Sequence, residues 1–445
     1  MSIRIKKGLD LPLAGAPSDE VREAPCPKKV ALDVSPFDYI RFKLHVKPGD
    51  CVACGDPLLE DKGCPSRVFV APVSGKIVDV VRGLKRQIQQ IIIECDPEFS
   101  NTPFEPFDPE KMDRQEIIDQ LLRTGRFAHI YQRPCARLAN PEQKPEAIFV
   151  KALESAPFLP SPQIEINEQR DAFAAGLHLL SKLCDGAVYL ISGEPMEFAY
   201  FENHVCKGPH PVANPSIHIE KLHPIRKIDQ VVWTVDAHNV IAMGLLAQKG
   251  MVLSRRIIAL AGEGIKADQR SFVRVFDGHP LDELLNGKLI DQPMRLISGD
   301  PLMGVKRGKD EFLGCDHYCI CAIPEPTKRS LMHFIGLGMK RYTSTKTYLS
   351  KALPSGDQSF STSLHGEERA FVDSGYYQKV MPLKVPVMQL IKALIIEDYE
   401  AAKELGLLEV DPEDFALPTF VCPCKIPMVD IVKKGQREYA SLYLS

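Results

Sequence analysis

Cysteines near the N-terminus are spaced in a way that could hold a metal ion. Cys51 and Cys54 form a C-x-x-C pair, and Cys26 and Cys64 lie close by in the sequence. A structural zinc site of four thiolates is usually built from two such pairs, whereas this stretch contains one. The paired cysteines also flank a predicted turn, where small half-buried residues suffice. We therefore predict no zinc site in this part of the chain.

A second group consists of Cys315, His317, Cys319 and Cys321, each two positions from the next. Alternate residues of a strand share one face, and at about 3.3 Å per residue the outer pair would lie about 20 Å apart. One ion cannot bind both ends of such a row, so we predict a buried apolar face of a strand. Residues 420–425 (FVCPCK) contain too few cysteines for a four-thiolate iron–sulfur cluster. The sequence therefore predicts no metal ligand.

A glycine-rich stretch at residues 262–267 (GEGIKA) has the form of a dinucleotide-binding fingerprint. In that fingerprint a helix follows the glycines, and its N-terminus binds the pyrophosphate. Here residues 271–276 alternate like a strand, so we predict a turn between two strands and no nucleotide site. The chain also lacks the G-x-S-x-G, P-loop and H-E-x-x-H motifs. We predict no catalytic residue.

The elements that carry these residues begin with a run of short strands at residues 44–94. Gly/Asp and Pro/Gly turns interrupt the run repeatedly, which indicates a flattened β-sandwich. The pattern V-x-x-G-D-x-V followed by P-V-S-G-x-V resembles the hammerhead half of biotinyl/lipoyl carrier domains. Such carriers display a modifiable lysine at a hairpin tip, but Lys62 stands about three residues early. We predict that Lys62 is an exposed turn residue without acylation.

Length and charge place broad limits on the protein. A chain of 445 residues is too long for one core and is expected to form three or four domains. Its formal net charge of −3 gives no electrostatic reason to expect nucleic acid as a partner. Thirteen cysteines without a signal peptide predict reduced thiols in the cytosol. The longest apolar stretch, residues 385–396, is interrupted by Pro, Gln and Lys, so we predict no transmembrane segment.

The central part of the chain alternates strands with helices. Apolar runs at residues 147–151, 187–191 and 231–235 predict buried strands, and residues 168–183 predict a helix between the first two. This alternation favours a parallel α/β layer. A further helix is expected from residue 113, where an acidic cap precedes an apolar periodicity that Gly125 ends.

The flanking regions are expected to differ from this layer. Strands near 256–260, 272–276 and 294–297 with a short helix at 281–285 predict a β-grasp unit. Residues 388–407 are predicted to be helical, after an irregular stretch and before a short tail. Two N-terminal runs, residues 3–5 and 29–32, are predicted to be edge strands on the hammerhead.

Several stretches, spread in order from one end of the chain to the other, carry a family resemblance. They are residues 5–15 (IKKGLDLPLAG), 82–86 (RGLKR), 208–211 (GPHP), 232–244 (VWTVDAHNVIAMG), 295–304 (RLISGDPLMG), 379–383 (KVMPL) and 420–425. Together with the hammerhead, they resemble the A subunit of the sodium-translocating NADH:quinone reductase (the NQR complex). The opening stretch is the most specific of them.

The resemblance implies an α+β multidomain fold with four regions. They are a biotinyl/lipoyl-like β-sandwich at 1–100, a Rossmann-like α/β domain at 101–254, a β-grasp (ubiquitin-like, soluble-ligand-binding-like) domain at 255–325, and an irregular linker with a C-terminal helical domain at 326–445.

It also implies a subunit of a respiratory translocase that oxidises NADH, reduces ubiquinone and exports Na⁺. The chain itself is expected to be non-catalytic and to bind no cofactor, the flavins and iron–sulfur centre being on other subunits. Its chief partner would be the membrane-embedded B subunit, which it would bind peripherally on the cytoplasmic face of the bacterial inner membrane.

The loop at residues 124–131 (TGRFAHIY) agrees with the expected lack of flavin. Flavin-binding relatives have a glycine-rich loop here, which lets phosphate approach the backbone, whereas this chain has one glycine and bulky side chains. The resemblance also implies a role in quinone binding, and a headgroup pocket needs apolar walls and hydrogen-bond donors. The candidate contacts are Phe127, His129, Tyr131 and Arg133. Alternatively, this loop packs between domains or on the B subunit.

Two further functions stay open at this stage. One is a self-sufficient flavin or iron–sulfur NADH dehydrogenase subunit, related to the flavoprotein of complex I, which an absorption spectrum would reveal. The other is a carrier protein modified at Lys62, which the intact mass would reveal.

Overall fold

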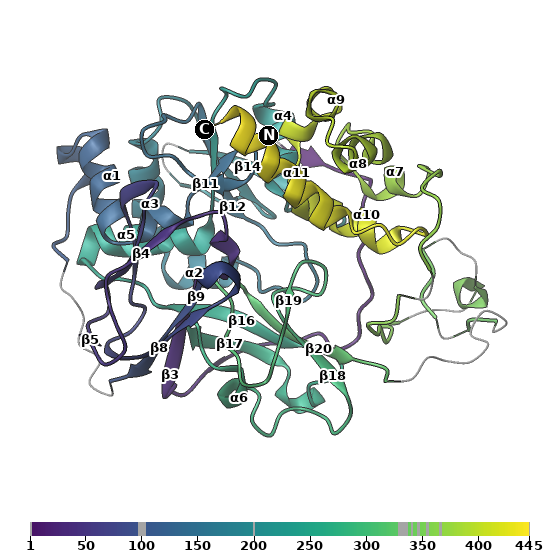
Figure 1. Cartoon of the computed structure of the whole chain (residues 1–445), viewed down its shortest axis with the longest axis horizontal. Coiled ribbons are helices and arrows are strands. Elements are labelled where there is room, and N and C mark those ends of the chain that lie inside the picture. The colour runs from purple at the N-terminus through teal and green to yellow at the C-terminus, as the bar shows by residue number, and fades with distance from the viewer. Residues whose placement is uncertain are drawn as a thin grey trace.

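The computed structural model describes residues 2–96, 104–198, 201–327, 337–339, 341–344, 348–352, 356–364 and 367–444. Within these residues the strands form sheets of seven, six, four and three strands, and helices surround the largest sheet (Figure 1). The protein is therefore a mixed α and β structure, as the sequence predicts.

The two smallest sheets pack together as a barrel-like sandwich. One has the order β3 (Lys29–Asp33), β9 (Ile88–Cys95), β8 (Gly75–Arg82), β5 (Cys51–Val52), and the other β4 (Phe42–Leu44), β6 (Pro57–Asp61), β7 (Cys64–Val70). Apolar side chains that alternate along these strands, such as Leu59, Phe69 and Ile91, meet in one core. Lys62 lies exposed in the turn between β6 and β7, where the sequence predicts it.

The largest sheet is mostly parallel. Its order is β1 (Ser2–Arg4), β14 (Glu202–Lys207), β13 (Val188–Ser192), β12 (Ala147–Ala152), β15 (Val232–Asp236), β10 (Tyr131–Arg133), β11 (Arg137–Leu138). The first five strands run parallel, and β10 and β11 extend the sheet antiparallel. The predicted parallel α/β layer is confirmed.

Helices cover both faces of this sheet. One face packs against α1 (Arg114–Arg123), α3 (Arg170–Ser181) and α5 (Ala237–Lys249), preceded in the chain by the short α2 (Gln163–Glu168). The other packs against α4 (Pro215–Leu222) and the C-terminal helices, yellow-green to yellow in Figure 1: α7 (Tyr377–Val380), α8 (Val387–Ile395), α9 (Tyr399–Glu404), α10 (Ala416–Val421) and α11 (Met428–Tyr443). Because both faces are buried, the central strands β12, β13 and β15 are mostly apolar instead of alternating.

The ends of two of these helices follow from local sequence. Asp113 caps α1 in a reciprocal capping box with Glu116. Asp236 accepts a hydrogen bond from the backbone N–H of Asn239 at the start of α5, and Gly250 ends that helix in a left-handed conformation with φ of 64°.

The six-stranded sheet has the order β19 (Val305–Arg307), β18 (Met294–Ser298), β20 (Cys319–Pro324), β16 (Arg255–Ala261), β17 (Ser271–Phe276), β2 (Ser18–Glu23). The short α6 (Leu281–Leu284) packs on its core. Residues 262–267 connect the antiparallel strands β16 and β17, with Gly262 at φ of 94°. The predicted turn in place of a nucleotide fingerprint is confirmed.

The N-terminal thirty residues join three sheets in turn. β1 pairs with β14 in the α/β sheet, β2 with β17 in the six-stranded sheet and β3 with β9 in the barrel-like sandwich. The prediction that residues 3–5 form an edge strand on the hammerhead is therefore wrong for this strand, because its unpaired backbone groups find the open edge of β14.

Two other predictions are also wrong. β20 begins at Cys319, so Cys315 and His317 do not share its face; they lie in a turn around Asp316, whose φ is 53°. The C-terminal residues expected to be a tail form α11, sixteen residues long, whose buried face includes Val432 and Tyr439. Its polar residues obscure an apolar stripe at helical spacing.

In the described part of the chain, no helix has the length and apolarity needed to cross a membrane.

Helices α3 and α5 cross with their backbones in close contact. A Cβ added to Gly244 would overlap the carbonyl oxygen of Ala172, and one added to Gly176 would overlap that of Val240. We predict that Gly244→Ala lowers the free energy of unfolding by about 2 kcal/mol, since the helices must separate. Urea denaturation measures this. Gly356→Ala is the control, because its Cβ would meet nothing within 4 Å; equal losses in both variants would contradict the packing argument.

Candidate functional site

A crevice opens at the carboxyl ends of β12 and β15, where ligands of parallel sheets commonly bind. Its volume is about 400 Å³. Segments from three parts of the chain enclose it: the α/β sheet, the turn before β20, and the loop before α10. The residues of this interdomain crevice include His129, Tyr131, Arg133, Lys151, Glu154, Asp236, Asp300, Asp316, Tyr318, Asp411 and Glu413.

A half-buried carboxylate, Asp316, joins two walls of the crevice. Its oxygens lie 3.2 Å from Nδ1 of His129, and one accepts a hydrogen bond of 3.2 Å from the Tyr131 hydroxyl. Arg256 approaches from the other side, with Nη1 at 3.4 Å and Nε donating to Asp277 at 2.7 Å. These five residues, the Asp316 cluster, connect the α/β sheet to the six-stranded sheet.

The electrostatics of this cluster favour charged groups. Burial alone would raise the pKa of Asp316, but His129 and Arg256 outweigh burial and hold it well below its usual range. Burial also opposes the charge of Arg256, yet Asp277 and the neighbouring Asp316 raise the pKa of that guanidinium. The cluster is therefore an ionised network in a poorly solvated place.

A second charged pair stands on β12. Lys151 Nζ lies 2.7 Å from Glu154 Oε1, and both side chains are mostly buried. Burial would lower the pKa of Lys151, but Glu154 raises it, so the ammonium stays charged. Burial raises the pKa of Glu154, and Lys151 offsets this only in part. The pair places an ammonium group and a neighbouring carboxylate in the crevice.

The third charged group connects the crevice to the C-terminal region. Arg133 on β10 forms ion pairs with Asp411 and, at 3.8 Å, with Glu413, and Nη1 donates to Ser216 Oγ at 3.3 Å. Burial raises the pKa of Asp411, with Glu413 and Asp414 adding to the effect, while Arg133 works against it. Asp411 is therefore a candidate to exchange a proton near neutral pH.

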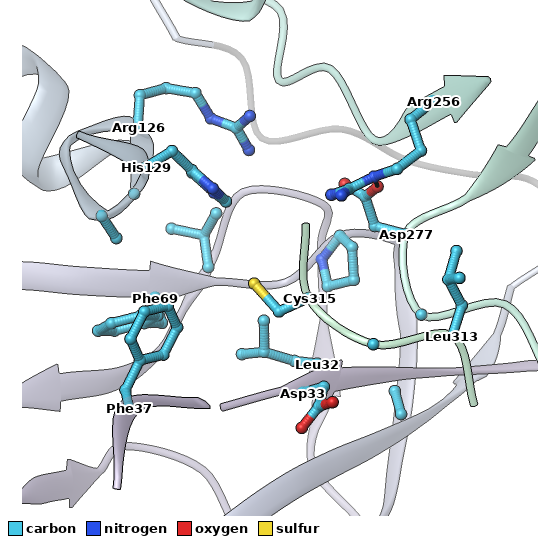
Figure 2. A pocket seen from close by; sticks show the side chains of 17 residues that line it. Leu32, Asp33, Phe37, Phe69, Arg126, His129, Arg256, Asp277, Leu313 and Cys315 are labelled. Atoms are coloured by element: carbon cyan, nitrogen blue, oxygen red, sulfur yellow. Dashed lines mark hydrogen bonds and ion pairs between the residues drawn. The ribbon is translucent and has the colours of Figure 1, made fainter. Parts of the chain in front are cut away.

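A smaller cavity lies on the far side of His129, between the sandwich, the α/β sheet and the six-stranded sheet (Figure 2). Its volume is about 60 Å³. In Figure 2, Arg126, His129 and Arg256 approach it from one side, and Leu32, Phe37 and Phe69 lie on the other.

Three of the four predicted quinone contacts line the crevice: His129, Tyr131 and Arg133. The fourth, Phe127, is fully buried beneath it and packs edge-on against Trp233, with ring centroids 5.5 Å apart. Because Phe127 lies within the short 3₁₀ helix η4 (Arg126–His129), its side chain enters the core, whereas His129 at the end of that helix reaches the crevice.

Sequence reasoning missed most of the charged wall, namely Lys151, Glu154, Asp236, Asp300, Asp316, Asp411 and Glu413. Two of them could have been chosen from the sequence. Lys151 and Asp236 stand at the carboxyl ends of apolar strands, where ligands of parallel sheets bind. Among the described residues no group of three or more His, Cys, Asp and Glu side chains could hold a metal ion, and all thirteen cysteines are free thiols.

The sandwich and the α/β sheet together define a class of protein. Residues 3–96 match the family described as the NqrA N-terminal barrel-sandwich hybrid domain, and residues 112–252 match the NqrA second alpha/beta domain. A structural comparison with an NAD⁺-reducing [NiFe]-hydrogenase gives a TM-score of 0.34 at 9% identity over 48% of this chain and 47% of that one, too weak to support an argument. The protein is thus of the NqrA type.

Curated relatives specify the family. The A subunit of the Na(+)-translocating NADH-quinone reductase of Chlamydia caviae is 35% identical over 99% of this chain and 97% of its own. The corresponding proteins of Rhodopirellula baltica and Vibrio parahaemolyticus are 34% and 36% identical over 97% and 95% of this chain, and 96% of their own. The chain belongs to the family formed by the A subunit of the Na⁺-translocating NADH-quinone reductase.

We predict that Asp316→Asn lowers the free energy of unfolding by about 3 kcal/mol at pH 7, because Arg256 and His129 lose a buried charged partner. The pKa of Asp316 is held below that of the unfolded carboxyl. Its stabilisation is therefore complete above the unfolded value of 3.8 and is lost as the pH falls below it. Urea denaturation from pH 7 to pH 3 should show the gap between wild type and variant narrowing below about pH 4.

Asp310→Asn is the matched control, because Asp310 is an exposed aspartate of the same region. It should leave stability within about 0.5 kcal/mol of the wild type. A loss for Asp316→Asn that is equally small, or that does not depend on pH, would contradict the assigned role of the cluster.

Proposed function

We propose that this chain is the cofactor-free, peripheral subunit of the quinone reductase and that its interdomain crevice contacts the quinone headgroup. The observation that carries the proposal is the position of Tyr131 and Arg133 in a large crevice at the carboxyl ends of the parallel strands. These two residues are among the contacts predicted from the sequence.

Size favours the crevice over the smaller cavity. An apolar cavity of about 150 Å³ holds a single benzene ring. The crevice, at about 400 Å³, can accept a substituted ring, whereas the cavity of about 60 Å³ cannot without rearrangement. Apolar surface for the ring is available at Leu159, Pro215 and Val235.

The charged groups of the crevice suit a carbonyl that gains electrons. A quinone that accepts two electrons must also accept two protons, and its oxygens become more basic on reduction. Lys151 would stabilise the developing negative charge, and Glu154 and Asp411, whose pKa values burial raises, are candidates to deliver protons. The electrons would come from another subunit.

The proposal that no flavin binds here rests on the loop after α1. Phe127 occupies the core beneath that loop, and Gly125, its one glycine, is tightly packed against Val70. A phosphate has no glycine-lined access to this backbone. An absorption spectrum of the purified chain that shows bound flavin or an iron–sulfur cluster would instead favour a self-sufficient NADH dehydrogenase subunit.

We also propose the four-domain division 1–100, 101–254, 255–325 and 326–445, in which β1 and β2 of the first segment add edge strands to the sheets of the second and third. The family matches at 3–96 and 112–252 support the first two boundaries. The strand order β14-β13-β12-β15 supports a Rossmann-like second domain, because it repeats the 3-2-1-4 order of that fold. Parallel central strands β16 and β20, first and last in the unit, support a β-grasp third domain.

We further propose that the chain docks on the membrane-embedded B subunit, on the cytoplasmic face, through its C-terminal helices. Apolar side chains are exposed at the end of α8 and of α11: Ile395, Ile396, Leu442 and Tyr443. Both ends belong to one packed group of helices, since Tyr443 donates to Glu400 of α9 at 3.0 Å and Lys434 of α11 pairs with Glu397, just after α8, at 3.1 Å. Exposed apolar surface of this kind is typical of a protein interface.

For the quinone contact, we predict that a short-tail ubiquinone binds the purified chain with one-to-one stoichiometry in calorimetry. Tyr131→Ala and Arg133→Gln should each weaken the affinity about tenfold or more, because they remove a wall and a donor. Tyr443→Ala, an exposed tyrosine outside the crevice, is the control. Absence of binding heat, under conditions where the assembled complex does bind, would place the quinone site in other subunits.

For the docking surface, we predict that Ile396→Asp reduces the fraction of the chain that sediments with membranes when all subunits are expressed together. Ile396 is 72% exposed, so an aspartate should leave the fold intact and act on the interface alone. Met251→Asp, at a residue 47% exposed outside the C-terminal helices, is the control. Unchanged sedimentation of Ile396→Asp would contradict this surface.

A further inference from the structure

The wall of the smaller cavity in Figure 2 includes a buried arginine, Arg126, whose guanidinium has no partner among the described residues. The Arg126 side chain is 6% exposed, and its Nε has no hydrogen-bond partner. Within the described part of the chain, the guanidinium makes no hydrogen bond or ion pair within 4.0 Å, unlike the buried arginines Arg67, Arg133 and Arg256. A buried charge in this condition is costly unless something compensates it.

The other charged residues around the cavity already have partners. Asp277 accepts from Arg256 at 2.7 Å, and Asp33 accepts from Arg307 at 2.6 Å. His129 uses Nδ1 for Asp316. Both lining carboxylates are thus paired with arginines other than Arg126, and neither makes a direct ion pair with it.

The surroundings of Arg126 compensate its charge poorly. Burial lowers the pKa of Arg126, and the neighbouring Asp277 restores it only in part. Burial raises the pKa of the Cys315 thiol, so this lining residue is neutral and does not repel an anion. Arg126 therefore presents a poorly compensated positive charge to the cavity.

The shape and walls of the cavity limit what could fill it. Since a cavity of about 150 Å³ holds one benzene ring, a cavity of about 60 Å³ limits the occupant to a ligand of a few heavy atoms. Donors stand on one side, at Arg126 and His129, and the opposite side is formed by Leu32, Phe37 and Phe69. A tetrahedral phosphate needs donors all round, whereas a small carboxylate has one charged and one apolar end.

We propose that this cavity binds a small monocarboxylate such as acetate, whose carboxylate the Arg126 guanidinium holds and whose apolar end contacts Phe37 and Phe69. The site is separate from the interdomain crevice and does not depend on the proposed quinone contact. Because its walls come from the sandwich, the α/β sheet and the six-stranded sheet, the bound carboxylate would hold these three parts together.

The test is chemical unfolding of the purified full-length chain with increasing sodium acetate, at constant ionic strength set with sodium chloride. Wild type should gain stability saturably, as expected for a ligand that binds the folded state alone. Arg126→Met removes the fork of donors at nearly equal length, and its acetate response should be at least about tenfold weaker. Arg82→Met, at an exposed arginine of the hairpin between β8 and β9, should respond like wild type.

Two further measurements keep the test decisive. Without acetate, Arg126→Met should unfold at the same or a higher denaturant concentration than wild type, because it removes an uncompensated buried charge. Line broadening of ¹³C-labelled acetate should report binding to wild type directly. The proposal is overturned if acetate has no saturable effect, if Arg126→Met responds equally, if phosphate or chloride stabilises as strongly, or if Arg126→Met is clearly less stable in acetate-free buffer.

Discussion

The ionised cluster around Asp316 is the interaction on which the arrangement of the candidate site depends. Asp316 adopts a left-handed backbone conformation, which is unfavourable for a residue with a side chain, and its carboxylate lies among three donors. Tyr131 lies on β10 of the α/β sheet, His129 on the short helix η4 just before that strand, and Arg256 on β16 of the six-stranded sheet. Removing Arg256 would leave two carboxylates without their guanidinium partner, so the cluster fixes how these two parts of the molecule face each other.

This arrangement separates two cavities of different character. On one side of His129 the carboxyl ends of β12 and β15 leave a wide crevice with many charged groups, and on the other the sandwich closes a small cavity with one apolar wall. The same histidine lines both. A change in its contact with Asp316 would therefore be felt in both places, although their proposed ligands are unrelated.

Much of the fold could be predicted because its signals are local. Local patterns predict the secondary structure and burial of the apolar runs at 147–151 and 231–235. The turn residues within 44–94 likewise predict the short strands of the sandwich. The site was only partly predictable. Tyr131 and Arg133 could be chosen from the character of their loop, but Asp316 lies 185 residues from Tyr131 in the sequence, in a turn that the alternation of 315–321 conceals. Contacts of this kind depend on how domains pack, and no periodicity in a single sequence encodes that.

The threading of the N-terminus has a consequence for how the protein is made. β1 leaves the ribosome first, yet its partner β14 follows about 200 residues later, and the partner of β2 later still. At roughly 5 to 20 residues per second, the first strand waits about 10 to 40 seconds with an unpaired edge. The sandwich can be completed as soon as β9 has emerged, whereas the two larger sheets must wait for late strands to pair with β1 and β2. The unpaired N-terminal strands are exposed to wrong pairing during this interval, which is one in which chaperones could act.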